Sequence, residues 1–359
     1  MDFEFSSEQE MLRESVRAFL AAKFPLSEVR RGYGQPGPDR AAWDGLVDLG
    51  VVGLLVAEEH GGAGMGLVDA AVVLEELGRA VCPAPYASSA IGAVALADHE
   101  LLATLATGST IGTTAIYESG ARYRFECPST RATRAGDAWR LDGEKVHVAD
   151  AESATVVLVT ARDEDGALGV FATGDFTTEP TPTVDGSRRQ GRVVLSGSDA
   201  RRVETPGAVE VAVARALDCL GVAATVDGVG AAQRALELAV DYAKEREQFG
   251  KPIGAFQAVQ HLCADMLRTV ELGRAAAYYA CWALDDAPAD EAHRASTLAR
   301  AFAADAFPQL GGTAIQVFGG IGFTWEHDIH LYYKRLLTTA YALGTASEHL
   351  EELATLVVD

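Results

Sequence analysis

The sequence predicts an α+β chain in three consecutive parts: a helical N-terminal domain, a β-barrel or β-sandwich middle domain, and a C-terminal four-helix bundle. Apolar residues recur at helical spacing near both ends, whereas the middle third carries short β-branched runs between turn residues. No internal repeat or low-complexity linker interrupts this order. We expect the domain boundaries at residues 1–109, 110–206 and 207–359.

The N-terminal part begins with an expected helix that Ser7 would cap, because Glu10 follows three residues later as in a capping box. A second helical segment surrounds Trp43. A third runs from Leu67 to Val81, after a stretch of charged residues and glycines that interrupts the helical pattern.

In the middle part, the run from Thr155 to Thr160 is rich in β-branched residues. Alternating residues around Trp139 and short apolar runs at 168–171 and 193–195 resemble further strands. From Glu210 onward the pattern is helical again. We expect long helices over about 258–285 and from about Asp290, the latter stopping before Gly311 because Pro308 interrupts it.

Composition limits the function. Lys and Arg number 30 against 51 Asp and Glu, a formal charge of −21, so such a surface repels nucleic acid. No apolar run approaches the roughly 18 residues of a membrane span, and the N-terminus lacks the features of a signal peptide. Five scattered cysteines without a C-x-x-C pair fit a reducing compartment, so we expect a cytoplasmic protein. The richness in Ala, Gly, Arg and Asp is typical of a high-GC bacterium.

Two segments carry groups suited to an anionic ligand. Arg246 offers a bidentate donor for a phosphate oxygen, and Gly319, Gly320 and Gly322 allow close approach of backbone N–H groups. Each segment alone has an ordinary explanation, as a solvated arginine or as the glycine-rich end of a helix.

Together with three other segments they form a specific pattern. The segments are ERxxFGxxI at 245–253, AFQAVQ at 255–260, QVFGGIGF at 316–323, EEHGGAGMG at 58–66 and LEELGR at 74–79. In these motifs and in domain order the whole chain resembles the acyl-CoA dehydrogenase family. The resemblance implies α,β-desaturation of an acyl-CoA thioester, in which a glutamate takes the α-proton and FAD takes the hydride.

The resemblance also implies which residues hold the cofactor. In family tetramers, the adenine and pyrophosphate end of FAD is held largely by a neighbouring subunit. The residues of this chain that match that cradle are Arg246, Gln248, Phe249, Phe256, Gln257, Gln316, Gly319 and Gly320.

The catalytic positions depart from the family pattern. Leu343 stands where the family carries its glutamate base, and leucine cannot take a proton. Leu220 stands at the alternative base position of some members, and Gly221 at the adjacent arginine that helps hold the thioester. The nearby Asp218 is a candidate for a displaced base, whereas we expect Glu326 to order a helix start.

The flavin-ring positions of the middle part are altered as well. Residues 117–123 match the family's TEPGAGSD loop but lack its proline and its terminal Ser-Asp. In the strand matched by residues 143–150, His147 replaces the tryptophan that covers the ring and Ala149 replaces a threonine.

This division predicts a heteromer. A catalytic partner subunit would supply the base, the ring cradle and most of the acyl-CoA site, while this chain completes an FAD site shared at the interface. Paired α2β2 subunits of this kind act in bacterial steroid side-chain degradation, so the resemblance implies such a substrate and a flavoprotein or other electron acceptor. Two alternatives remain: a self-sufficient flavoenzyme with a displaced base, and a flavin-free scaffold. His327 and His330 lack further ligands at zinc-like spacing, so we expect no metal site.

Overall fold

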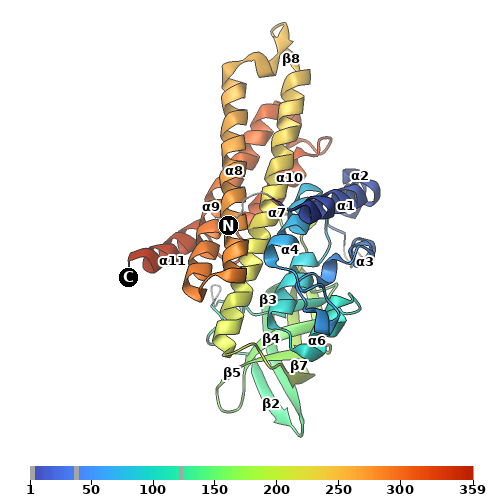
Figure 1. The fold of residues 1–359 in the computed structure, drawn as a ribbon, viewed down its shortest axis with the longest axis vertical. Coiled ribbons are helices and arrows are strands. Elements are labelled where there is room, and N and C mark those ends of the chain that lie inside the picture. Colours follow the sequence, from blue (N-terminus) through green and yellow to red (C-terminus); the bar gives the residue numbers. More distant parts are fainter. Residues whose placement is uncertain (1–4, 36–39, 121–123, 359) are drawn as a thin grey trace. The chain divides into compact units, whose positions relative to one another are not determined.

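A computed structural model describes residues 5–35, 40–120 and 124–358. Figure 1 shows the chain passing from helices through strands back to helices, which confirms the predicted fold class. The N-terminal helices are α1 (Ser7–Lys23), α2 (Leu26–Gly32), α3 (Arg40–Asp48), α4 (Leu67–Arg79), α5 (Val94–Leu96) and α6 (His99–Ala106), with shorter helical turns at Val51–Gly53, Glu58–His60 and Ala87–Ala93.

The strands are β1 (Gly112–Ala115), β2 (Arg131–Ala135), β3 (Ala138–Ala149), β4 (Val156–Arg162), β5 (Leu168–Thr173), β6 (Thr177–Thr181) and β7 (Gln190–Arg202). The C-terminal helices are α7 (Val209–Glu245), α8 (Gln257–Asp286), α9 (Ala289–Phe318), α10 (Ile329–Ala340) and α11 (Ala346–Val358). Two-residue strands β8 (Glu247–Gln248) and β9 (Lys251–Pro252) join α7 to α8.

Two local predictions were wrong. The N-cap of α1 is Ser6, whose hydroxyl accepts from the backbone of Gln9 while the Gln9 side chain accepts from Ser6. This reciprocal pair satisfies two N-terminal donors one residue earlier than the Ser7–Glu10 spacing suggested. Helix α9 also continues through Pro308 to Phe318, where Gly319 forms its C-cap. Buried apolar residues on both sides of Pro308 stabilise the helix enough to absorb the lost hydrogen bond.

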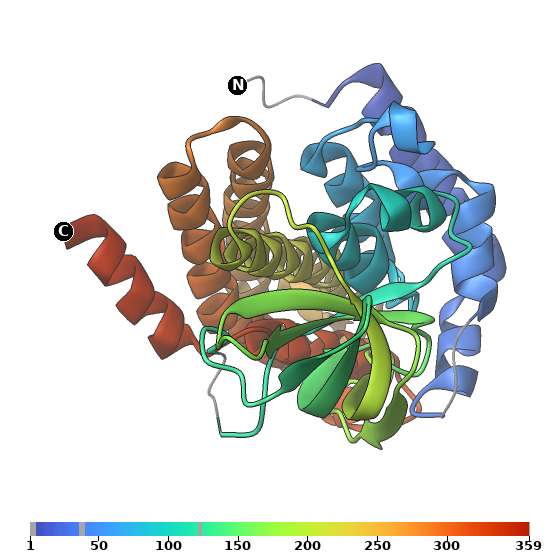
Figure 2. The same cartoon turned by 90° about the horizontal axis from the view of Figure 1, so that it is seen from below.

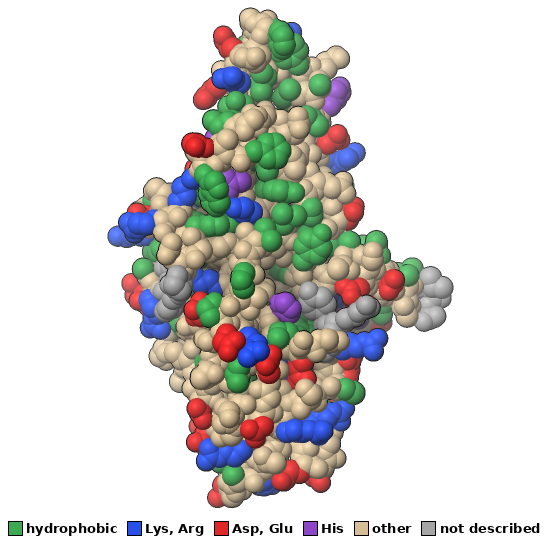
Figure 3. Space-filling view, turned by 180° about the vertical axis from the view of Figure 1, so that it is seen from behind, with side chains coloured by type: hydrophobic (Ala, Val, Ile, Leu, Met, Phe, Trp, Pro, Cys, Tyr) green, Lys and Arg blue, Asp and Glu red, His purple; other side chains and the backbone are tan. Residues whose placement is uncertain are grey.

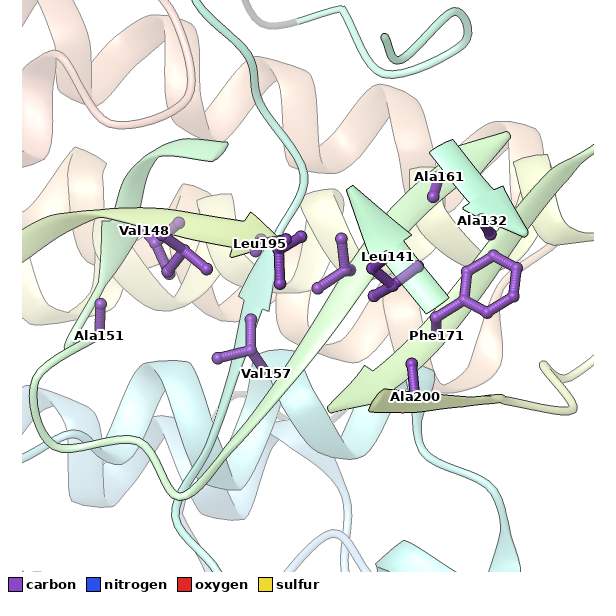
Figure 4. Close-up of a cluster of buried hydrophobic side chains, with 12 residues drawn as sticks. Ala132, Leu141, Val148, Ala151, Val157, Ala161, Phe171, Leu195 and Ala200 are labelled. Carbon is purple, nitrogen blue, oxygen red and sulfur yellow. The ribbon is translucent and has the colours of Figure 1, made fainter. Parts of the chain in front are cut away.

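The seven strands form a sheet that curls toward closure. Its order is β1-β4-β2-β3-β7-β5, with β6 beside β7, and β5 pairs back with β4. The ring β4-β2-β3-β7-β5 therefore returns to its first strand, as Figure 2 shows. Inward-facing side chains fill the enclosed space, among them Leu141, Val157, Phe171 and Leu195 (Figure 4). The middle part is thus barrel-like.

Packing divides the chain into two compact units that do not follow the linear order. One contains Met1–Tyr33, Ala71–Cys82 and Gly221–Asp359, and the other contains Gly34–Ala70 and Pro83–Leu220. The transitions between helix and strand lie between α6 and β1, and between β7 and α7.

Within the first unit, α4 and α7 cross in backbone contact. A Cβ atom added at Gly78 would lie 1.9 Å from the carbonyl oxygen of Asp227, and one at Gly230 would lie 1.9 Å from that of Glu75. Any side chain at either glycine would force the helices apart. Next to this crossing, the buried Arg335 on α10 donates to Asp227 at 2.9 Å. The glycine of the LEELGR segment is therefore required by helix packing.

Candidate functional site

The hairpin between α7 and α8 projects one of the predicted cofactor residues into solvent. Phe249 and Gly250 both have positive φ, 54° and 76°, and form the two-residue turn between β8 and β9. The Phe249 side chain is 92% exposed at this tip, which lies at the top of Figure 1. The base of the hairpin is fixed by a hydrogen bond from the Ile253 amide to the Arg246 carbonyl at 2.8 Å.

Aromatic contacts bring the second predicted segment to the same end of the helices. The ring of Tyr242, one turn before Arg246 on α7, lies 4.5 Å from that of Phe318 at the end of α9. Phe318 in turn lies 4.2 Å from His327. The ERxxFG and QVFGG motifs, about seventy residues apart in sequence, therefore adjoin one another.

The three glycines after α9 have different roles. Gly319 caps the helix with φ of 64°, and a Cβ atom at Gly322 would lie 2.8 Å from the Ile315 carbonyl oxygen. These two glycines are needed by the backbone. Gly320 has open space where its side chain would be, so its backbone is accessible to a ligand.

The donors at this end suit the adenosine and pyrophosphate part of a dinucleotide. Arg246, Gln248, Gln257 and Gln316 are exposed, and Phe256 is partly buried. Phe249 and Phe256 pack edge to face at 6.1 Å, and the Lys251 ammonium lies 4.3 Å from the Phe256 ring. Cationic groups, amide donors and aromatic surface are thus combined, as an anionic and aromatic ligand requires. The residues that the sequence predicted for FAD fit this group.

Apolar side chains accompany these donors on the surface. Figure 3 shows them at the tip of the hairpin, at the top of the view, and in a band below it. Exposed large side chains in this unit include Phe249, Leu267, Leu272, Leu298, Ile321, Phe323 and Trp325. Exposed apolar area of this kind is typical of a surface that another protein covers.

The segment matching the family's ring-contacting loop is fixed by a saturated carboxylate. Glu118 accepts hydrogen bonds from the backbone and hydroxyl of Ser129 and of Thr130, and from Lys145 Nζ at 2.8 Å. Burial alone would raise the pKa of Glu118, but the bonds from Lys145, Ser129 and Thr130 outweigh it and lower that pKa to about 2. Glu118 is fully engaged in holding the loop; residues 121–123 of the same segment lie outside the described part of the chain.

His147 lies in an irregular stretch of β3. The register with β7 shifts between Lys145 and Val148, and His147 has a φ of 55°. The amide of Val146 donates to the Tyr117 carbonyl at 2.9 Å, which ties the bulge to the Glu118 segment. The exposed His147 ring lies 3.4 Å from the Gln190 side chain. A bulge re-aims a strand locally, so the direction of the His147 side chain is set by this irregular backbone.

The segment of Leu343, the position at which we expected the base to be replaced, lies against His349, a residue that the sequence did not predict. Leu343 has a φ of 61°, and a Cβ atom at the next residue, Gly344, would lie 2.7 Å from Cε1 of His349. A Cβ atom at Gly221 would lie 2.3 Å from Cδ of Arg300. The structure thus assembles Gly221 and Leu343, 122 positions apart, around α9 and α11.

Glu352 on α11 joins these charged side chains. Its carboxylate lies 3.3 Å from His293 Nε2, 3.4 Å from Arg300 Nη2 and 3.9 Å from His349 Nδ1. Hydrogen bonds from His293 and His349, with the charge of Arg300, hold the pKa of Glu352 well below its usual value. Only the tertiary fold brings these residues together, although the i, i+3 spacing of His349 and Glu352 on one helix was a usable signal.

Two further positions were considered for the base, Leu220 and Asp218, and both lie on α7 close to Gly221 in sequence. Leu220 packs against Gly92, where an added Cβ atom would lie 2.7 Å from Leu220 Cδ2. Asp218 is buried on α7. Both belong to the second compact unit.

His327 and His330 are packing residues in the described structure. The His330 ring is buried 4.6 Å from Trp325, and neither of its nitrogens has a hydrogen-bond partner among the described residues. Burial, with the charges of Lys334 and Arg30, lowers its pKa to about 4. Within the described ranges, no group of three or more His, Cys, Asp or Glu side chains could hold a metal ion.

A polar cavity in the first unit also escaped the sequence analysis. It has a volume of about 320 Å³ and is lined mainly by side chains of α1, α4, α7 and α8. Its arginines face carboxylates: Arg17 meets Glu76 at 2.6 Å, Arg79 meets Glu237 at 2.7 Å, and Arg274 meets Glu75 at 3.1 Å. These three ion pairs, with Arg13 in the same lining, make the cavity an internal charge network.

Among the helices of the described residues, none is both long and apolar enough to span a membrane.

Comparisons with known proteins agree with this geometry. The family model of the acyl-CoA dehydrogenase N-terminal domain matches residues 6–118, and that of the C-terminal domain matches residues 211–357. Acyl-CoA dehydrogenase IpdE2 of Mycolicibacterium smegmatis is 34% identical over 353 residues, covering 97% of this chain and 98% of the relative.

Solved structures also show similarity to acyl-CoA dehydrogenases. A Tcur3481–Tcur3483 steroid acyl-CoA dehydrogenase variant is 30% identical with a TM-score of 0.87, covering 98% of each chain. The ChsE4–ChsE5 complex from Mycobacterium tuberculosis contains a chain that is 27% identical with a TM-score of 0.88, covering 100% of this chain and 99% of that one. With its two family domains, its relatives along nearly the full length and its shared fold, the chain belongs to the acyl-CoA dehydrogenase family.

Proposed function

We propose that this chain is the non-catalytic subunit of a heteromeric, FAD-dependent acyl-CoA dehydrogenase, and that it completes the FAD site of a catalytic partner. The observation that carries the proposal is a contrast within one chain. The donors that would reach a neighbour's cofactor are present and exposed, whereas the base position holds Leu343.

The intact side of this contrast is the end of the helices at Arg246 and Gly319. Arg246 would bind the pyrophosphate, with Gln248 and Gln257 as neutral donors. Phe249 and Phe256 would cover apolar parts of the cofactor, and Gln316, Gly319 and Gly320 would contact the adenine end. When bound, FAD supplies the hydride acceptor; this chain contributes binding and orientation.

The altered side of this contrast consists of the positions where catalysis at this chain's own site would need functional groups. An α-proton must be taken by a base within hydrogen-bond reach, and neither Leu343 nor Leu220 can act as one. Glu118 is saturated by five donors. The tryptophan position is occupied by His147, in a bulge.

The relatives support the heteromer and the substrate class. A structure named for a pair of chains is described as a steroid enzyme, and another is a two-component complex. We infer an α2β2 assembly, a steroid-derived acyl-CoA bound mainly by the partner, and a flavoprotein or other electron acceptor. None of the five cysteines forms a disulfide in the described part of the chain, which fits the cytoplasm of a bacterium.

Cofactor stoichiometry tests this function. The chain should be purified alone and after co-expression with a dehydrogenase that carries intact base and TEP motifs, for example one encoded by a neighbouring gene. We expect about one FAD per heterodimer, and no stoichiometric FAD on the chain alone. Two FAD per heterodimer, or a yellow homotetramer, would overturn the proposal and favour a self-sufficient enzyme. A stable complex whose FAD content does not depend on this chain would indicate a scaffold.

A further inference from the structure

The space around the two substituted family positions is already occupied by this chain's own side chains. At Gly221, the first three atoms that an added Cβ would meet are Cδ, Cγ and Nε of Arg300, at 2.3, 3.1 and 3.2 Å. At Gly344, all three are ring atoms of His349, at 2.7 to 3.4 Å. Both contacts are closer than a real side chain tolerates, so each glycine admits the neighbouring side chain only because it has none of its own.

The two intruding side chains are held by one carboxylate. Arg300 and His349 are both buried, 8% and 3% exposed. Arg300 Nη2 lies 3.0 Å from the Thr297 hydroxyl and 3.4 Å from Glu352, and His349 faces the same Glu352 oxygen at 3.9 Å. His293 approaches the other oxygen of Glu352 at 3.3 Å. If the Arg300 side chain moved away from Gly221, it would lose its contacts with Thr297 and Glu352.

Helix α11, which carries Glu352 and His349, is fixed independently at its start. The backbone and hydroxyl of Thr345 both donate to Glu348 at 2.8 Å, and the Glu348 amide donates back to the Thr345 hydroxyl. This capping box begins the helix directly after Gly344. Helix α11 also packs on α9, and this packing sets the position of Glu352 relative to Arg300.

We propose that Arg300, held by Glu352, is an internal plug that closes this chain's own thioester pocket. Resting on the proposed function, this inference adds that the replacement of the family's base and arginine by Leu343 and Gly221 is accompanied by physical closure of the pocket. Acyl-CoA would then bind once per heterodimer, on the partner. Arg300 acts here through its volume and its anchorage, and takes no part in chemistry.

The test counts binding sites on the intact heteromeric complex by calorimetry, with a non-oxidisable acyl-CoA thioether as the probe. We expect one probe per heterodimer for the unmodified complex and two for Arg300→Ala, a doubling of the stoichiometry. Arg300→Lys is the matched control: it keeps a long side chain that can still pair with Glu352, so its count should stay at one. Two sites in the unmodified complex, or one site in Arg300→Ala, would overturn the plug.

A second measurement does not depend on ligand binding. Gly221→Ala should lower the melting temperature of the unmodified complex, because the new methyl group meets Arg300, but should leave that of Arg300→Ala unchanged. If Gly221→Ala lowers the melting temperature equally in the unmodified complex and in Arg300→Ala, Arg300 does not occupy this space. FAD content decides the proposed function separately, so one FAD with an unchanged probe count would reject the plug alone.

Discussion

The Nζ atom of Lys145 lies 2.8 Å from Oε1 of Glu118, and the lysine side chain is completely buried in the second compact unit. The same ammonium contacts the Ile116 carbonyl at 3.2 Å and the Thr160 hydroxyl at 3.1 Å. The Lys145 ammonium therefore joins the segment after β1 to β3 and β4. It also compensates the charge of Glu118, which holds the segment before β2. Such a buried pair is costly to break from one side only.

We predict that Lys145→Met destabilises the chain by about 3–5 kcal/mol, because it leaves Glu118 buried without its cation. Urea unfolding of the purified complex measures this loss. The double variant Lys145→Met/Glu118→Met should be more stable than Lys145→Met alone, since no uncompensated charge remains. If the double variant is less stable than the single one, the hydrogen bonds of Glu118 to Ser129 and Thr130 dominate over its ion pair.

A second prediction concerns Leu343. Restoring glutamate there should leave the isolated chain inactive, because a base acts only within reach of its proton and opposite a bound flavin. In the complex, Leu343→Ala should change turnover less than twofold, apart from small packing losses. Steady-state assays on complexes of verified composition measure both. A hundredfold loss for Leu343→Ala in an assembled complex would show that this position serves catalysis.

The ion network of the polar cavity gives a pH dependence. Burial opposes ionisation of Glu237, but hydrogen bonds from Arg79, Gln233 and Arg234 lower its pKa to about 2. A carboxyl whose pKa falls on folding stabilises the fold above its unfolded value, and this contribution is lost as pH falls from about 4.5 toward 2. We expect Glu237→Gln to cost about 1.5–3 kcal/mol at pH 7, the range for hydrogen bonds to charged groups.

Thermal melts between pH 7 and pH 3 check the sign. The stability difference between Glu237→Gln and the unmodified protein should shrink as the pH falls below 4.5, because the native carboxyl approaches its protonated form. Asp241→Asn provides the control on the same helix: its side chain is 63% exposed and pairs only at 4.0 Å with Lys244. It should change stability by less than about 1 kcal/mol. A difference for Glu237→Gln that is constant with pH contradicts the assignment.

The sequence predicted the fold more completely than the site, for physical reasons. Helical periodicity and β-branched runs are local, so α8 and β4 appear near their predicted bounds and α7 begins near the predicted Glu210. The extension of α9 past Pro308 was missed because tertiary packing overrode a local breaker. The proposed cofactor residues lie largely in the contiguous motifs ERxxFG and QVFGG, which a sequence pattern can identify. Arg300, His349 and Glu352 come from two helices and meet Gly221 of a third, and no contiguous pattern encodes that meeting.

The last prediction separates a cofactor-binding subunit from a scaffold. If Arg246 binds the pyrophosphate, Arg246→Ala should weaken FAD retention in the complex even though the flavin reacts in the partner. The pyrophosphate is an anion that must enter an assembly containing a chain with a formal charge of −21, so its local cation matters. A charge-assisted hydrogen bond contributes about 1.5–3 kcal/mol, which corresponds to roughly ten- to a hundredfold weaker binding.

The variants of Arg246 and Gln316 can be ranked by their expected effect on FAD retention. Arg246→Lys should restore binding only partly, because it keeps the charge but loses the planar fork that matches two phosphate oxygens. Gln316→Ala should cause a smaller loss than Arg246→Ala, since it removes a neutral donor. Arg268→Ala on α8 is the matched control, because this arginine is 70% exposed and its carboxylate neighbour, Asp265, is equally solvated. FAD dissociation, followed by fluorescence on complexes that still assemble, measures all four. If Arg246→Ala releases FAD no faster than Arg268→Ala, the ERxxFG motif does not bind the cofactor, and this chain supports its partner by contact alone.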